Sequence, residues 1–103
     1  MSAIEPGEPF TIEFGKHNRR LQVVALNGRQ KRRAVACMAN LRSAKDPDAM
    51  LAVLDELEQV TKVCSPTITE EIIETLDDAL QAEIVSKTLM RTVISEDDAK
   101  KSE

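Results

Sequence analysis

The segment "KDPDAMLAVLDELEQVTKVCSP", residues 45–66, decides the fold because it carries the cleanest helical pattern in the chain. Asp46 is a good N-cap, and Pro47 stands at the first helical position, where a missing N–H is tolerated. Pro66 ends the helix, because proline disfavours helical backbone in the residue before it. The expected buried stripe recurs at helical spacing and comprises Met50, Leu51, Val53, Leu54, Leu57, Val60 and Val63 or Cys64.

A second helix is predicted upstream, in "NGRQKRRAVACMANL", residues 27–41. Asn27 is a good N-cap, and Gln30 stands three residues later as its capping-box partner. We expect this helix to run to about Ser43. Its buried stripe is expected to comprise Ala34, Cys37, Met38 and Leu41.

Further helix is predicted over residues 67–94, as either one kinked helix or two. Thr67 or Thr69 is expected to cap a short first part that carries Ile68, Ile72, Ile73 and Leu76. Asp77 or Asp78 is expected to begin a longer second part that ends near Ile94. Its apolar positions are Leu80, Ile84, Val85, Leu89 and Val93.

Two β-prone runs precede the helices. In "PFTIEF", residues 9–14, apolar side chains alternate with Thr11 and Glu13, the period of a strand with one buried face. Gly15 and Asn18 supply turn residues before "LQVVAL", residues 21–26. Because an isolated hairpin is marginally stable, we expect it to pack on the helices. The fold class is therefore α+β, mainly α, with an N-terminal β-hairpin on a bundle of three to four helices.

The 103 residues suit one domain, which we divide by composition. Residues 1–8 are expected to form a flexible lead, and residues 9–94 a single globular domain, with the hairpin over 9–25 and the helices over 28–94. Residues 95–103, "SEDDAKKSE", are expected to form a disordered charged tail, because they hold one apolar residue. Only two aromatic residues are present, so the core is expected to be aliphatic.

Charge is strongly segregated along the chain, although the net charge is only −4. Residues 16–45 carry nine positive charges and no acidic residue, whereas residues 46–103 carry fifteen acidic and five basic ones. The two halves are electrostatically complementary. Contact within the fold, head-to-tail contact between copies, or a partner that meets one face would each satisfy this pattern.

Little in the sequence indicates catalysis. His17 is the only histidine and lies in a turn, and neither a G-x-S-x-G motif nor a phosphate-binding glycine loop is present. Cys37 and Cys64 are expected to be reduced, buried thiols of a cytosolic protein, because the start "MSAIEPGEPF" does not resemble an export signal. We expect no enzyme activity, no cofactor, no metal and no membrane-spanning segment.

A nucleic-acid-binding regulator is a second hypothesis, based on the basic segment 16–45. Cations at the start of the first helix oppose the helix dipole, which suggests that they have a partner. Against nucleic acid, no aromatic residue is interleaved for base stacking, and the acidic half would repel phosphate. We therefore expect this basic patch to meet protein, with the acidic face of a neighbouring copy as the candidate partner. The patch comprises Arg19, Arg20, Arg29, Lys31, Arg32 and Arg33.

The order of these parts resembles a known family. A β-prone hairpin is followed by "AMLAVLDELEQVTKVC", by the short step "EEIIETL", by "LDDALQAEIVSKTLM" and by the charged ending "SEDDAKKSE". This arrangement, over residues 9–103, is similar to that of the tail assembly chaperones of long-tailed bacteriophages and prophages. The resemblance implies a non-catalytic factor of the infected host cytoplasm that is not retained in the mature virion.

Members of that family bind the long, helical tape measure protein and help recruit tail tube subunits, so the resemblance implies both as partners. In many such phages a ribosomal frameshift produces a longer form, with which Lys100 and Lys101 are compatible. A client helix needs an apolar groove, for which we expect Met50, Leu54, Leu57 and Leu89 to provide contacts. Self-association through the basic and acidic faces is a further expectation. A general protein-interaction domain is the third hypothesis.

Overall fold

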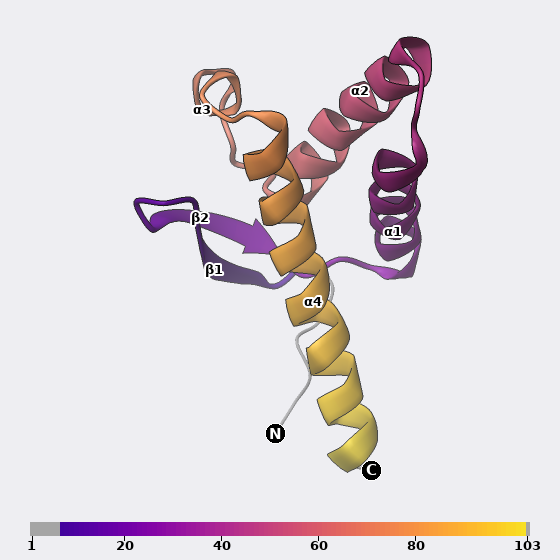
Figure 1. The fold of residues 1–103 in the computed structure, drawn as a ribbon. Coiled ribbons are helices and arrows are strands. Elements are labelled where there is room, and N and C mark those ends of the chain that lie inside the picture. The colour runs from indigo at the N-terminus through magenta and orange to yellow at the C-terminus, as the bar shows by residue number, and fades with distance from the viewer. Residues whose placement is uncertain (1–6, 103) are drawn as a thin grey trace.

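The computed structural model describes the backbone of residues 7–102 and the side chains of residues 7–91. A hairpin is followed by four helices (Figure 1). This order confirms the α+β, mainly α fold class. The elements are β1 (Pro9–Phe14), β2 (Arg19–Val24), α1 (Gly28–Ser43), α2 (Pro47–Cys64), α3 (Glu70–Glu74) and α4 (Asp78–Ser102).

Side-chain caps fix where the helices begin. Asn27 and Gln30 form the expected capping box, with both hydrogen bonds at 2.9 Å. Asp46 Oδ1 accepts a hydrogen bond from Ala49 N at 2.8 Å, which confirms the start of α2. Thr69 Oγ1 and Asp77 Oδ1 accept equivalent bonds at the starts of α3 and α4. Because each has its own cap, the segment over 67–94 contains two helices.

Hydrogen bonding between the strands extends beyond their assigned bounds. Gly7 N donates to Ala25 O at 2.8 Å, and Ala25 N donates to Glu8 O at 3.0 Å. The expected flexible lead over 1–8 is therefore wrong for residues 7 and 8; residues 1–6 lie outside the described part. Gly15 and Asn18 adopt φ values of 77° and 50°, the left-handed conformation that the turn between the strands requires.

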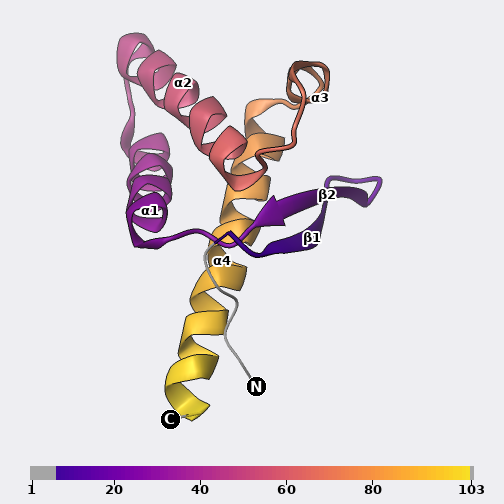
Figure 2. The ribbon, with the colours of Figure 1, turned by 180° about the vertical axis from the view of Figure 1, so that it is seen from behind.

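The expected disordered tail is also corrected, because α4 continues through Ser102 instead of ending near Ile94. No glycine or proline interrupts this stretch, and glutamate, alanine and lysine are good helix formers. Residue 103 lies outside the described part. The C-terminal half of α4 projects beyond the body in both views (Figures 1 and 2).

Two clusters of buried apolar side chains hold the body together, and α4 contributes to both. Ile84 and Val85 are each 0% exposed, yet they belong to different clusters. We call the first cluster the helical core: Leu26, Ala34, Cys37, Leu57, Val60, Cys64 and Val85. We call the second the hairpin core: Ile12, Phe14, Val23, Ile73, Leu76 and Ile84.

Polar side chains from the helical part also anchor the hairpin. A two-stranded sheet leaves a row of backbone groups unpaired on each strand. Ser65 Oγ donates to the carbonyl oxygen of Gln22 in β2 at 2.7 Å, and Lys87 Nζ donates to the carbonyl oxygen of Glu13 in β1. Each strand is thereby tied to a different part of the helical layer.

Replacing Leu57 by alanine is expected to lower the free energy of unfolding by about 2–5 kcal/mol, because Leu57 is 0% exposed and its loss leaves a cavity in the helical core. Leu51, which is 62% exposed on the same helix, is the matched control, with an expected change within about 0.5 kcal/mol. Chemical denaturation measures both. Equal effects at the two positions would contradict the assignment of the core.

Candidate functional site

The two halves of α2 have different surroundings. In the C-terminal half, Leu57, Val60 and Cys64 are buried in the helical core, to which α4 contributes Val85. The N-terminal half diverges from α4 in both views (Figures 1 and 2). There the apolar side chains stay partly open to solvent, and Leu51 is 62% exposed. Apolar side chains in the N-terminal half of α2 are therefore only partly covered by the rest of the described chain.

The expected groove residues are not brought together as an open groove. Leu57 is 0% exposed, so its assignment as a client contact is wrong: α4 packs against this half of α2 and seals it. Leu54 and Leu89 are partly buried and pack against the helical core. Met50 is partly exposed. Met50 differs from the other three, because it neither belongs to the helical core nor packs against it within the described residues.

Met50, Leu51 and Leu54 define what we call the distal face of α2. They lie within about 100° of arc on the helix, because each residue advances the chain by about 100°. All three keep part of their side chain exposed. Flexible methionine side chains adapt to partners of different shape. The distal face is thus a small apolar surface suited to a second helix laid alongside α2.

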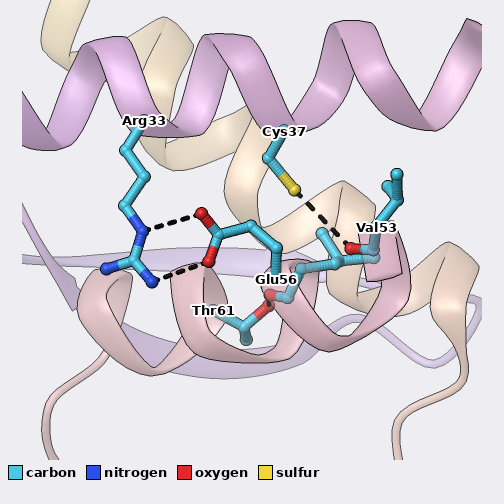
Figure 3. Close-up of polar contacts among 6 residues, drawn as sticks. Arg33, Cys37, Val53, Glu56 and Thr61 are labelled. Carbon is cyan, nitrogen blue, oxygen red and sulfur yellow. Dashed lines mark hydrogen bonds and ion pairs between the residues drawn. The ribbon is translucent and has the colours of Figure 1, made fainter. Parts of the chain in front are cut away.

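An ion pair holds α1 beside α2 (Figure 3). Arg33 donates from Nε and from a terminal nitrogen to the two carboxylate oxygens of Glu56, at 3.0 Å and 2.7 Å. One helical turn further along α1, Cys37 Sγ contacts the carbonyl oxygen of Val53 at 4.0 Å. A shallow pocket of about 130 Å³ lies here, lined by Cys37, Asn40, Ala52, Val53 and Glu56. α1 and α2 are packed together through the helical core, and the pair adds a polar contact at the edge of that packing.

The hydrogen bond from Arg33 lowers the pKa of the Glu56 carboxyl below its ordinary value. The same bond raises the pKa of the Arg33 guanidinium. Both side chains are about two-fifths exposed, at 43% and 40%, so solvent screens the pair. The contribution of the pair to the free energy of unfolding is therefore modest. Its bidentate geometry mainly orients the two side chains.

The basic residues of β2 are occupied within the fold. Arg19 donates to Thr75 Oγ1 at 3.2 Å, and its guanidinium lies 5.2 Å from the centre of the Phe14 ring. Arg20 pairs with Glu13 at 3.3 Å across the hairpin. These two arginines therefore join the hairpin to its own neighbours.

The other four residues of the predicted patch lie at the start of α1. This helix follows the C-terminal end of β2, and its start lies across the body from the hairpin turn (Figure 1). The expectation of one six-residue patch is therefore wrong, since a six-residue strand separates its two parts. Arg33 binds Glu56, and Lys31 is partly buried and has a partner. Arg29 and Arg32 are exposed, and no hydrogen bond or ion pair joins their side chains to the described residues.

A larger pocket, of about 560 Å³, lies between the hairpin turn and the start of α4. Its lining includes Lys16, His17, Arg19, Asp77, Leu80 and Glu83. The Glu83 carboxylate pairs with Lys87 at 2.9 Å and accepts hydrogen bonds from Gly15 N, and these contacts lower its pKa. Glu83 thus anchors the turn to α4, and the lining of this pocket does not form a nucleophile, base and oxyanion arrangement.

The two cysteines are free and buried, as expected. Burial raises the pKa of the Cys64 thiol to about 12, and it also raises the pKa of Cys37. Both thiols are therefore protonated and weakly nucleophilic near neutral pH. Over the part of the chain that the structure describes, no group of three or more potential metal ligands gathers.

The sequence matches no protein-family model, no curated protein matches it, and no solved structure matches its fold. Within residues 7–102, no helix combines the length and the apolar character needed to cross a bilayer.

Replacing Glu56 by glutamine is expected to lower the free energy of unfolding by about 0.5–1 kcal/mol at pH 7, because the charge of the pair is lost. The pKa of Glu56 is lower in the folded state, so the pair contributes fully above the ordinary glutamate pKa and loses its contribution as the pH falls through the folded value. Wild type and variant should therefore converge in acid.

Denaturant titrations between about pH 3 and pH 7 measure this difference across the range in which glutamate titrates. Asp55→Asn is the matched control, because Asp55 is exposed on the same helix and no ion pair to it is found among the described residues. A difference between wild type and Glu56→Gln that stays constant over the whole range would contradict the assigned role of the pair.

Proposed function

We propose that the protein is a non-catalytic chaperone of phage tail assembly. In this role it binds a helical part of the tape measure protein and helps recruit tail tube subunits. It acts in the cytoplasm of the infected host and leaves before the virion is complete. The proposal is supported by the resemblance in element order and by a fold whose surface offers helix faces for binding.

The observation that carries the proposal is the distal face of α2. Met50, Leu51 and Leu54 keep apolar surface in contact with water at the end of α2 that diverges from α4 (Figures 1 and 2). A client whose apolar stripe would otherwise aggregate can cover this surface, and both sides then remove apolar area from water. We therefore place the client on the N-terminal half of α2, and not on a groove that includes Leu57 and Leu89.

The size of the distal face suits a chaperone, because the client must leave later. Complete burial of one large aliphatic side chain contributes about 1.5–3 kcal/mol, and these three side chains are only partly exposed. Association must also offset the lost freedom of two molecules. A single distal face therefore supports moderate affinity, and several copies along a long client would act together.

The alternative function is a small nucleic-acid-binding regulator that uses the basic segment 16–45. One observation favours it: Arg29 and Arg32 are exposed at the start of α1, without a partner among the described residues. Because Arg19, Arg20 and Arg33 bind groups of the chain itself, the free cations of the segment are too scattered for a continuous phosphate track. We therefore keep the chaperone as the main proposal.

Co-expression with the client tests the proposal. The client is the long, helix-rich protein expected to be encoded just downstream of this chain, and its soluble fraction is the readout. Met50→Asp combined with Leu51→Asp is expected to return the client to the insoluble fraction, because charge on the distal face opposes apolar docking. Val35→Asp is the matched control, because Val35 is 53% exposed on α1 and lies off the distal face.

Circular dichroism of the purified variants separates loss of binding from loss of fold. If the double variant folds like the wild type and keeps the client as soluble, the distal face is wrongly assigned. If the wild type itself fails to change the solubility of the client, the chaperone proposal is wrong.

A further inference from the structure

The start of α1 carries cations that the fold itself does not explain. Arg29 and Arg32 are exposed in the first turns of α1, where the helix dipole is positive and no acidic residue is present in the first turn. No residue of the described chain pairs with either of them. We call these two residues the basic pole.

An acidic pole lies on α3 and the first turn of α4. Glu71, Glu74 and Asp78 are exposed, and none of them has an ion pair within the described residues. Glu70 differs, because it pairs with Lys62 at 2.9 Å. Asp77 caps α4 and is exposed as well. The acidic pole as we define it comprises Glu71, Glu74 and Asp78.

The two poles lie on opposite sides of the body. In Figure 1, α3 stands at the upper left and the start of α1 on the right at about mid-height, and Figure 2 shows the same separation from behind. The chain therefore cannot neutralise one pole with the other. Arg19 lies beside the acidic pole, where it donates to Thr75, and Lys16 lines a pocket together with Asp77. No ion pair joins either of them to the acidic pole among the described residues. The charge that complements each pole is found on every other copy of the same chain.

We propose that a second copy of this chain docks head to tail, with the basic pole of one copy against the acidic pole of the next. Because the complementary charges lie on opposite sides of one molecule, a second copy in the same orientation can meet each pole with the opposite charge. Such a contact uses two different patches, so it either closes into a ring or continues as an open chain of copies. This inference is independent of the client and of the distal face.

The contact consists mainly of exposed charges, so it is weak and sensitive to salt. Exposed ion pairs contribute little individually, and 0.15 M salt screens charges beyond about 8 Å. Self-association should therefore be visible at high protein concentration and low ionic strength. It becomes stronger wherever copies are held close together, because tethering raises their effective concentration.

Sedimentation velocity of the full chain at low and at high salt tests the proposal. The wild type is expected to sediment faster as its concentration rises at low salt, and to return to the monomer at high salt. Arg29→Glu with Arg32→Glu, and separately Glu71→Lys with Glu74→Lys, are each expected to remain monomeric. An equimolar mixture of these two variants is expected to associate again, because each supplies the charge that the other lacks.

The matched control for Arg29→Glu with Arg32→Glu is Arg42→Glu with Lys45→Glu. It changes the net charge by the same amount at exposed positions outside both poles. It should sediment like the wild type. Arg29→Glu with Arg32→Glu should also raise the melting temperature slightly, because acidic residues suit the start of a helix. Loss of association in a variant of equal or higher stability excludes unfolding as the cause.

Three results would overturn the proposal. The first is a wild type that stays monomeric at low salt and high concentration. The second is a mixture of the two pole variants that stays monomeric. The third is a pair of observations on the variant Arg29→Glu with Arg32→Glu: it sediments like the wild type, but it loses a gel shift that the wild type gives on random-sequence duplex DNA. That result would make phosphate the partner of the basic pole.

Discussion

The structure depends on two adjacent residues of α4 that are buried on different sides of that helix. Ile84 packs in the hairpin core and Val85 in the helical core, and both are 0% exposed. We expect neither the hairpin nor the α1–α2 pair to be stable alone, because two-stranded sheets and isolated short helices are marginal in water. α4 therefore joins two incomplete layers into one body.

This central position of α4 also determines which surface is left over. α4 packs against the C-terminal half of α2 and covers Leu57, so it cannot also cover the half of α2 that lies beyond. The distal face follows from that geometry, and the Arg33–Glu56 pair adds a modest contact between α2 and α1. Stability and binding thus use the two halves of one helix, and a partner can dock without disturbing the core.

Local chemistry made most of the fold predictable, and long-range contact made the site less so. The caps at Asn27 and Asp46 were predictable because a capping side chain bonds backbone three residues away. Periodicity placed Leu57 on the buried side of α2, but it could not say whether α4 or a client covers that position. The Arg33–Glu56 pair joins residues 23 positions apart, which spacing alone does not reveal. The six basic residues looked like one patch, because a sequence does not show that β2 separates its own first residues from the start of α1 in space.

Native-state hydrogen exchange of the free chain tests the central claim most directly, namely that one half of α2 is core and the other half is a surface awaiting a partner. Amides of residues 60–63 should exchange only through global unfolding, because Val60, Thr61 and Cys64 are buried, and Val60 and Cys64 belong to the helical core that α1 and α4 share. Amides of residues 51–54 should exchange through smaller openings with a lower free energy. Equal protection of the two halves, at the level of global unfolding, would contradict the account.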